Sequence, residues 1–375
     1  MKTFKAGNRV NQGYYKSFDP THLQRKWQLD DSRVINLLSK ADRQLGRLDM
    51  YSEYIPNIDL FISMHVTKEA TQSSKIEGTQ TQIEEALMDR ERIPPEKRDD
   101  WDEVQNYIEA MNRALNELEH TPFSSRLVRK THRILMKGVR GAHKQPGEFR
   151  KCQNWIGGTS INDAVFVPPV HEAIPDLISD LEKFVHDEET GLPDLIKIAI
   201  MHYQFETINP FLDGNGRVGR LLITLYLVHC GILKKPILYL SDYFEKNRID
   251  YYDHLTRVRE KNDMDRWIRF FLTGVIETAK SSISTFDSIL QLQKKTDSII
   301  RSLDSRAVNA QKVVHYLYKR PIVTAEQVSK AADVSMPTAY KLIRSLEELN
   351  ILQEITGTAR GRVYVFGKYL DLYRS

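Results

Sequence analysis

The chain has 375 residues, 41% of them hydrophobic and 28% charged, which predicts a globular protein long enough for two or three domains with cores of their own. Only two cysteines occur, Cys152 and Cys230, without the spacing of a metal site, and this favours a reducing cytoplasm. The longest apolar run, Leu221 to Leu233, is too short to cross a bilayer, and the first residues lack the apolar core of a signal peptide. We therefore expect a cytoplasmic protein without membrane contact.

The net charge of +4 is unevenly distributed along the chain. Residues 301–375 carry 12 Lys and Arg against 7 Asp and Glu, whereas residues 1–300 carry 42 against 43. Because all of the basic excess lies near the C-terminus, the sequence predicts a C-terminal module with an anionic partner.

Helical periodicity dominates most of the chain. Residues 1 to about 25, rich in Gly, Asn, Gln and Tyr, are expected to be extended, and apolar residues then recur at three- and four-residue steps. The pair Pro94-Pro95 interrupts this pattern, because a residue before proline disfavours the helical conformation. The stretch from Gly147 to Val170 lacks this helical pattern. Its β-favouring residues flank two turn signals and predict a small β-hairpin at about Ile156 to Val167.

After Lys295, three short helical segments lead to two β-like runs separated by residues 356–361. Thr324 opens a helix with Gln327 three residues later, a capping box, and Pro337 lies in the first turn of the next helix. Helix, turn, helix and a basic hairpin form the plan of a winged helix. The sequence therefore predicts a mainly α fold with one small hairpin, divided into domains at 1–100, 101–295 and 296–375.

The segment NPFLDGNGRVGR, from Asn209 to Arg220, has the layout of an anion-binding loop. Gly214 and Gly216 let the backbone turn its N–H groups inward, and a helix starts directly after them, so free donors and the positive end of the helix dipole face one spot. Arg217 and Arg220 are one helical turn apart and can both donate to phosphate oxygens. An ordinary capped helix N-terminus is the alternative, but the two arginines in register favour an anion site.

The same segment resembles the signature of the Fic family, H-x-F-x-(D/E)-G-N-G-R-x-x-R, at every position but the first. Fic proteins transfer AMP from ATP to a hydroxyl side chain of a target protein, with Mg²⁺. The resemblance implies that Asp213 holds the metal, that Arg220 binds the γ-phosphate, and that the α- and β-phosphates are bound by Gly214, Asn215, Gly216 and Arg217. It also implies that the predicted hairpin is the flap that aligns the target. Tyr252 is a candidate for the adenosine pocket, with a core aromatic residue as the alternative.

A second motif, SSKIEG from Ser73 to Gly78, resembles the inhibitory helix of the family, [S/T]-x-x-x-E-[G/N]. The resemblance implies that Glu77 pairs with Arg220 in the place of the γ-phosphate, so that ATP binds out of line for transfer. A solvated surface charge is the alternative role of Glu77, but its position upstream of the loop favours inhibition.

Asn209 stands where the family has the histidine that takes the proton from the target hydroxyl. An amide cannot accept that proton, and loss of a positioned base costs about 10²–10⁴ in rate. We therefore expect nucleotide binding to persist and AMP transfer to be strongly impaired, and we expect His202 to be structural rather than a replacement base. Three explanations stay open: a substitution introduced into an active enzyme, a natural pseudoenzyme that binds nucleotide, or removal of AMP that depends on Glu77.

The C-terminal module allows a second class of function. Its last long helix and hairpin would present a polar and basic surface made of Ser335, Thr338, Lys341, Arg344, Arg360 and Arg362. Such a surface predicts DNA binding within residues 306–366, although winged helices also bind proteins. The rival hypothesis is therefore a DNA-binding regulator with the Fic domain as a nucleotide sensor. An adenylyltransferase would need a target with a Tyr, Thr or Ser hydroxyl, this chain itself included, and a homodimer is compatible with either function.

Overall fold

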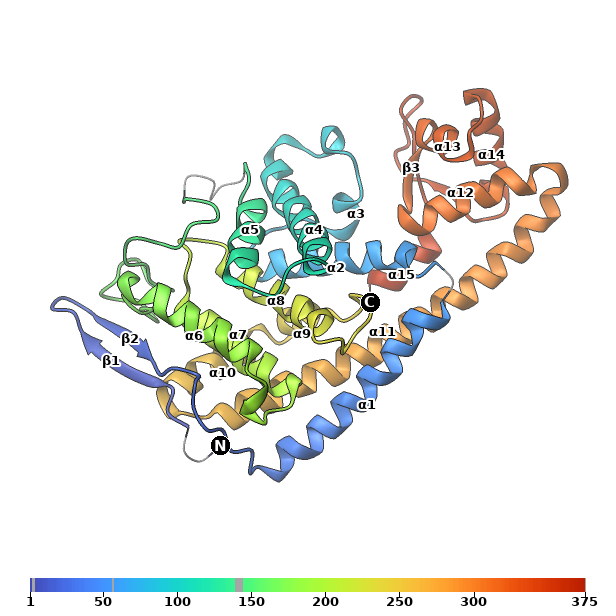
Figure 1. Ribbon diagram of the computed structural model, residues 1–375. Helices are drawn as coiled ribbons and strands as arrows, with labels where there is room; N and C mark the ends of the chain where they lie inside the picture. Colours follow the sequence, from blue (N-terminus) through green and yellow to red (C-terminus); the bar gives the residue numbers. More distant parts are fainter. Residues whose placement is uncertain (2–3, 56, 139–143, 375) are drawn as a thin grey trace.

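The computed structural model describes the chain except for residues 2–3, 56, 139–143 and 375 (Figure 1), and it confirms the mainly α fold. The helices are α1 (Ser32–Tyr54), α2 (Asp59–Ile76), α3 (Ile83–Ala86), α4 (Arg98–Leu118), α5 (Ser125–Leu135), α6 (Ile174–His186), α7 (Asp194–Ile208), α8 (Asn215–His229), α9 (Ser241–Lys246), α10 (Arg248–Lys261), α11 (Met264–Ile300), α12 (Ala307–Lys319), α13 (Ala325–Ala332), α14 (Met336–Glu348) and α15 (Gly367–Arg374). The strands are β1 (Gly7–Asn11), β2 (Lys16–Pro20), β3 (Ile322–Thr324), β4 (Gln353–Glu354) and β5 (Val363–Val365). Among the described residues, no helix is both long and apolar enough to span a membrane.

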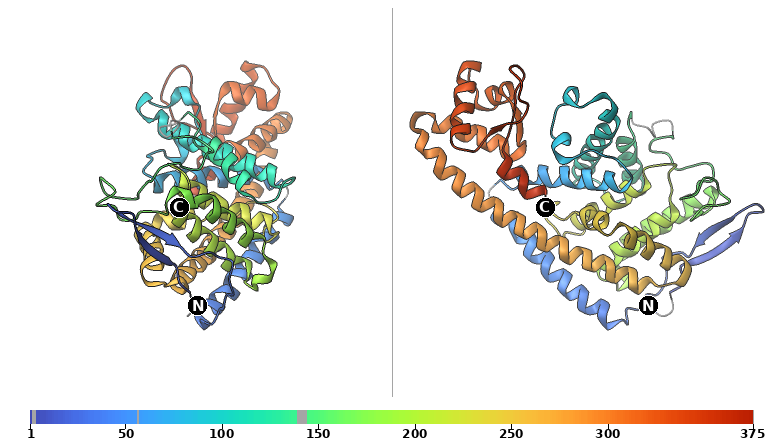
Figure 2. Two further views of the ribbon diagram at one scale, coloured as in Figure 1. Left: turned by 60° about the vertical axis from the view of Figure 1, so that its left-hand side comes forward. Right: turned by 180° about the vertical axis from the view of Figure 1, so that it is seen from behind.

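Two long helices, α1 and α11, lie side by side along one edge of the molecule (Figures 1 and 2). The buried residues of α1 are Val34, Ala41, Leu45 and Leu48, whose spacing of three, four or seven places them on one helical face. Helix α11 has 37 residues and is therefore about 55 Å long. It runs beyond the helical body and leads into the C-terminal elements, so the boundary predicted near Lys295 lies inside it.

The centre of the helical body is formed by α7 and α8. Every residue from Leu195 to Ile208 is buried, and so is every residue from Asn215 to Leu227 except Gly216. Helices that are covered all round lie in the middle of a domain. Helices α2, α4 and α5 pack on α8, while α6 and α11 pack on α7. The anion-binding loop predicted from the sequence therefore connects the two central helices.

The strands near the N-terminus differ from the expectation. Residues expected to be simply extended form the antiparallel hairpin β1–β2, with Gly7 opposite Pro20 and Asn11 opposite Lys16. The hairpin expected at Ile156 to Val167 is narrower than predicted, because it contains a single antiparallel bridge, Ile156 with Phe166. Strand β2 extends this narrow hairpin, since the Phe18 N–H donates to the Val167 carbonyl at 2.9 Å.

The C-terminal elements pack together as three helices, α12 to α14, and a three-stranded antiparallel sheet in the order β3-β5-β4. The order of elements follows the expectation, and their assignment as a winged helix stays a prediction, as does the division into domains. Side chains connect this unit to the segment between α3 and α4: Arg320 pairs with Asp89 at 2.6 Å, and Arg92 donates to the Gly361 carbonyl at 3.0 Å.

Candidate functional site

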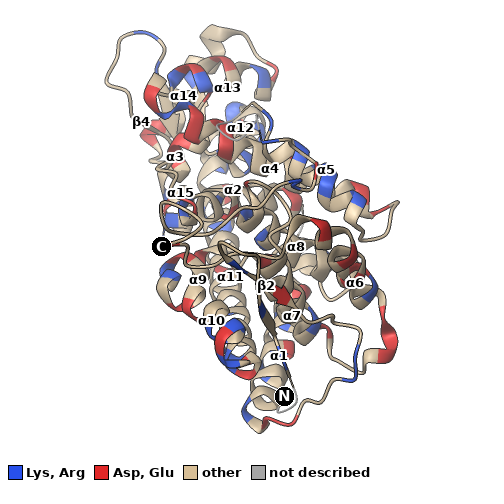
Figure 3. Ribbon diagram, turned by 90° about the vertical axis from the view of Figure 1, so that its left-hand side faces the viewer, with Lys and Arg blue, Asp and Glu red and all other residues tan. Residues whose placement is uncertain are grey.

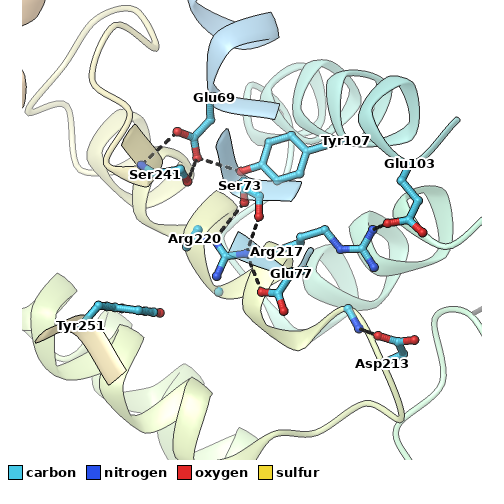
Figure 4. A network of polar contacts seen from close by, with 12 residues as sticks. Glu69, Ser73, Glu77, Glu103, Tyr107, Asp213, Arg217, Arg220, Ser241 and Tyr251 are labelled. Carbon is cyan, nitrogen blue, oxygen red and sulfur yellow. Dashed lines mark hydrogen bonds and ion pairs between the residues drawn. The ribbon is translucent and has the colours of Figure 1, made fainter. Parts of the chain in front are cut away.

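The predicted loop begins and ends with residues in the left-handed conformation. Asn209 caps α7 with φ of 49° and ψ of 62°, and Gly214 precedes α8 with φ of 72°. Asparagine and glycine are the residues that adopt this conformation most easily. The chain therefore reverses tightly between two helices that pack against each other, and the N-terminus of α8 faces the site (Figure 4).

The side chain of Asn215 holds the loop closed. Its Oδ1 accepts from the Phe211 N–H at 2.8 Å, and its Nδ2 donates to the Phe211 carbonyl at 2.8 Å and to Oδ1 of Asn209 at 3.1 Å. Asn215 was predicted to bind phosphate. In this structure its side chain supports the loop, so its contribution to an anion would come through its backbone N–H at the start of α8.

The carboxamide oxygen of Asn209 is already occupied. It accepts from Asn215 and, at 2.7 Å, from Nδ2 of Asn154, a residue near the base of the narrow hairpin. Asn209 is also buried, with 7% of its surface exposed. Because its oxygen carries two hydrogen bonds, the amide has only N–H donors left for a ligand and no free acceptor for a proton.

Two residues that the sequence analysis did not select anchor the loop from outside. His132 on α5 stacks on the Phe211 ring, with centroids 3.7 Å apart, and its Nε2 lies 3.0 Å from the Asp213 carbonyl. Its Nδ1 accepts from the Gly147 N–H at 2.8 Å, so Nε2 carries the proton and donates. Burial lowers the pKa of His132 to about 4, which keeps the ring neutral.

Arg150 fixes the other end of the loop. Its Nε donates to the Asn209 carbonyl at 3.0 Å, its Nη2 donates to the Pro169 carbonyl at 2.6 Å, and its backbone N–H donates to the Pro210 carbonyl at 2.9 Å. Arg150 thus binds three carbonyl groups, two through its buried guanidinium and one through its backbone N–H, and joins the start of the loop to the end of the narrow hairpin. No sequence signal identifies this role, because its partners lie far along the chain.

Arg220 lies at the centre of the site and binds the predicted inhibitory helix (Figure 4). Its Nη2 donates to Oε1 of Glu77 at 2.7 Å, and its Nε donates to Oγ of Ser73 at 2.9 Å. The Glu77 carboxylate lies directly over Gly216, where an added Cβ would be 2.3 Å from Oε1. Burial acts to lower the pKa of Arg220, but Glu77 and neighbouring tyrosines outweigh it and raise the pKa. Gly78, with φ of 103°, lets the chain turn away directly after Glu77.

The contacts of Ser73 and Arg220 are supported by a further buried carboxylate on α2. Glu69 accepts from the Tyr107 hydroxyl at 3.0 Å and from the hydroxyl and N–H of Ser241 at 2.5 and 3.1 Å (Figure 4). Burial raises the pKa of Glu69 despite these bonds. Helix α2 is therefore held by polar contacts to α4, α8 and the start of α9, rather than by apolar packing alone.

Arg217 pairs with a different carboxylate from the one that Arg220 binds. Its Nη1 donates to Oε2 of Glu103 on α4 at 2.9 Å, and both side chains are nearly inaccessible, at 5% and 8% exposed (Figure 4). If Arg217 binds phosphate as expected, its guanidinium must contact Glu103 and the phosphate at the same time.

Two arginine donors in the first turns of α8 have no hydrogen-bond partner among the described residues. They are Nη1 of Arg220 and Nε of Arg217, both buried. Leaving a buried charged donor unsatisfied is costly, so such atoms indicate a missing ligand. An anion bound at the α8 N-terminus beside Arg220 would satisfy Nη1 of Arg220, which is the fit expected for a phosphate.

Asp213 is the acidic residue within the loop itself, directly before Gly214. Its Oδ1 accepts from the Gly214 N–H at 2.7 Å and its Oδ2 pairs with Lys144 at 3.2 Å. Burial acts to raise the pKa of Asp213, but the Gly214 N–H and Lys144 outweigh it and lower the pKa, so the carboxylate is ionised. No cluster of three or more His, Cys, Asp or Glu side chains suited to a metal occurs in the described part of the chain. A single carboxylate fits a Mg²⁺ ion held mainly by phosphates and water.

The two neighbouring tyrosines of α10, Tyr251 and Tyr252, differ in their exposure to solvent. Tyr252 is 39% exposed, so it is not the core residue that was the alternative interpretation. Its neighbour Tyr251 is fully buried and its hydroxyl bonds Nε2 of His202 at 2.8 Å. The other ring nitrogen of His202 lies 3.0 Å from the Gly219 carbonyl, and burial lowers the pKa of His202 to about 3. His202 is thus a structural residue between α7, α8 and α10, as expected.

Two family models match the chain, "Fic/DOC family N-terminal" over residues 35–116 and "Fic/DOC family" over residues 122–227. The chain carries both domains of the Fic/DOC family. The first match covers α2 and all but the last two residues of α4, and the second covers α5 to α7, the loop and all but the last two residues of α8.

Curated relatives are named protein adenylyltransferases. The chain is 30% identical to "Protein adenylyltransferase Fic" of Aedes aegypti over 154 residues, which is 38% of this chain and 28% of the relative. It is 26% identical to a probable protein adenylyltransferase of Aquifex aeolicus over 238 residues, or 61% of this chain and 68% of the relative. The chain thus spans between a quarter and a third of the length of the mosquito relative.

Solved structures show the same fold at low identity. A Fic family protein from Desulfovibrio desulfuricans aligns with a TM-score of 0.58 and 20% identity, covering 91% of this chain and 98% of that one. Fic-1 from Caenorhabditis elegans aligns with a TM-score of 0.54 and 22% identity over 69% of this chain and 74% of that one.

Proposed function

We propose that this Fic protein is a protein adenylyltransferase that is inhibited by its own Glu77 and impaired by Asn209. The observation that carries the proposal is the contact of Glu77 with Arg220 over Gly216, at the mouth of an anion cradle in which Nη1 of Arg220 has no hydrogen-bond partner among the described residues. The names of the relatives support the reaction class. The substrates would be ATP and a protein with a Tyr, Thr or Ser hydroxyl.

The residues of this chain would act mainly by binding and orientation. The α8 N-terminus and Arg220 would bind the phosphates, with Arg217 contributing where its pair with Glu103 permits. In the transfer step, the target oxygen bonds to the α-phosphorus, the bond from that phosphorus to the bridging oxygen breaks, and pyrophosphate leaves. The hydroxyl proton needs an acceptor, and Asn209 offers none, since its oxygen already carries two hydrogen bonds. We therefore expect this chain, with Asn209 in place, to transfer AMP slowly.

Asp213 is the residue that would hold Mg²⁺. Its carboxylate is ionised and half exposed, at 38%, next to the cradle. When bound, the metal would neutralise charge on the phosphates. Lys144 would have to release Asp213 for this, so the metal and the lysine compete for one carboxylate.

The test is to restore the base and remove the inhibitor. Asn209→His, alone and combined with Glu77→Gly, is incubated with Mg²⁺ and ATP labelled on the α-phosphate, and protein-bound label is measured. We expect weak label in the single variant and strong label in the double one, including label on the chain itself. Asn209→Ala with Glu77→Gly is the matched control without a base and is expected to stay unlabelled. No label in any variant while ATP still binds would exclude transfer to the chain itself and favour the nucleotide-sensing alternative.

A second candidate function rests on the C-terminal surface. Lys341 and Arg344 are exposed on α14, as is its N-cap Ser335, and Arg360 and Arg362 are exposed on the β4–β5 connection. Figure 3 shows basic positions on α14. A DNA-binding regulator with a nucleotide-sensing Fic domain would use this face, and its affinity would fall steeply with salt. Fluorescence anisotropy with labelled duplex DNA at two salt concentrations tests this proposal, with Lys341→Ala/Arg344→Ala as the variant. If the variant binds DNA as tightly as the unchanged chain, this surface is not the DNA-binding site.

A further inference from the structure

A polar cavity of about 230 Å³ lies between α2, α9, α11 and α15 (Figure 1). No described residue of α8 or of the loop before it lines this cavity, so it is separate from the proposed phosphate site. Helix α2 borders both places, because its Ser73 binds Arg220. Four residues of α2 at helical spacing line the cavity: His65, Lys68, Glu69 and Gln72.

Helix α11 contributes a row of hydroxyl groups to the wall. Four residues on one helical face supply them: Thr278, Ser281, Ser282 and Thr285. In the described part of the chain, none of these hydroxyl groups has a hydrogen-bond partner. Other hydroxyl groups of α11 bond to the helix itself, as Thr273 does when it donates to the Arg269 carbonyl at 2.8 Å. The row that lines the cavity is therefore free to bind a ligand.

Three more residues of the wall have a buried polar atom without a hydrogen-bond partner among those described. The atoms are Nε2 of His65, Oε1 of Gln72 and the hydroxyl of Tyr239. His65 and Tyr239 are each only 7% exposed. Burial lowers the pKa of His65 to about 3, so its ring is neutral. Unpaired buried polar atoms are costly, and several of them around one cavity indicate a bound molecule that completes their hydrogen bonds.

The charged side chains of the cavity are largely paired with one another. Asp242 contacts Lys246 at 3.0 Å and Lys68 at 3.8 Å. Glu69 accepts from Ser241 and Tyr107, as described above. Glu277, like Lys246, is exposed at the rim, so a ligand can enter from solvent there. The groups that remain for a ligand inside the cavity are therefore mainly uncharged donors and acceptors.

We propose that this cavity binds a small, uncharged polyhydroxylated molecule, of the monosaccharide or cyclic polyol class, through the hydroxyl row of α11 and Tyr239. Each ligand hydroxyl can donate and accept, which matches wall hydroxyls whose protons rotate to suit. The volume is below about 300 Å³, the lower end for pockets of drug-sized ligands, and this fits a single sugar ring. A phosphorylated ligand would need a free cation, whereas both lysines already contact Asp242. The site does not depend on the proposed transfer reaction.

Saturation-transfer difference NMR on the full chain without nucleotide tests the proposal. The probes are glucose, galactose, mannose and myo-inositol at millimolar concentration, with glucose 6-phosphate and glutamate as charged comparators. At least one uncharged polyol should bind. Thr278→Val/Thr285→Val replaces two wall hydroxyls by methyl groups of similar size and should weaken binding about tenfold. Thr273→Val is the matched control, because its hydroxyl lies on the same helix but bonds to Arg269, and it should bind like the unchanged chain.

A second variant keeps the test valid if the double variant fails to fold. Ser281 is an exposed residue of the wall, so Ser281→Trp should fill the opening of the cavity at little cost to folding and abolish binding. If none of the polyols binds to the unchanged chain, the cavity holds water only and the proposal is wrong. Binding that persists in Ser281→Trp places the polyol elsewhere on the molecule, and binding of the charged comparators alone overturns the ligand class. An equal loss in Thr273→Val would refute the role of the hydroxyl row.

Discussion

Removal of the Glu77 carboxylate should increase the affinity of the chain for ATP. In the structure, Glu77 holds the guanidinium of Arg220 at 2.7 Å, and Arg220 is only 1% exposed. A ligand phosphate must break this bond before it can use the same donor. Hydrogen bonds to charged groups contribute about 1.5–3 kcal/mol. Because Glu77 itself is 34% exposed, solvent screens the pair and the lower end of that range applies, which corresponds to about tenfold in affinity.

Isothermal titration calorimetry with ATP and Mg²⁺ measures this effect on Glu77→Gly. The matched control is Glu245→Gly, because Glu245 pairs with Lys75 at 2.9 Å at the same end of α2 but does not touch Arg220. Without nucleotide, Glu77→Gly should also melt at a lower temperature, since a buried cation loses its partner, and saturating ATP should restore the melting temperature. An unchanged ATP affinity, or an equal gain in the control, would refute the reasoning.

Three further predictions follow from buried groups. Glu103→Ala leaves the Arg217 cation buried without its main partner and should lower the free energy of unfolding by about 3–5 kcal/mol, measured by urea denaturation; a loss below 1 kcal/mol would contradict the pair's importance. His202 has a pKa of about 3 in the fold and 6.5 when unfolded, so the unfolded state binds more protons between these values and stability falls as pH drops below 6.5. The stability deficit of His202→Gln at pH 7 should therefore shrink by about 2 kcal/mol at pH 5, and a constant deficit would show that the histidine titrates normally. Gly216→Ala should displace the Glu77 carboxylate, 2.3 Å from the added Cβ, yet obstruct the phosphate cradle; calorimetry should show no gain in ATP affinity, and a gain like that of Glu77→Gly would mean that the backbone there does not touch phosphate.

Local features of the fold were predictable because their causes lie within a few residues. The Thr324–Gln327 capping box forms with both of its hydrogen bonds, and Gly214 takes the left-handed conformation that its loop requires. Helix periodicity gave the mainly α class for the same reason, since each amphipathic segment contains its own pattern. The β1–β2 hairpin was missed because strand pairing depends on a partner strand, and a short polar strand has little pattern of its own.

The sequence by itself determined the chemistry of the loop: where two helices meet, which glycines free the backbone N–H groups, and that position 209 carries an amide rather than a side chain that titrates. Only the tertiary structure decided which charges face one another. Arg220 meets Glu77 across 143 positions of chain, and Arg217 turns to Glu103 across 114, although the two arginines look equivalent in the sequence. Partners of this kind depend on how helices pack, and no local pattern specifies that packing.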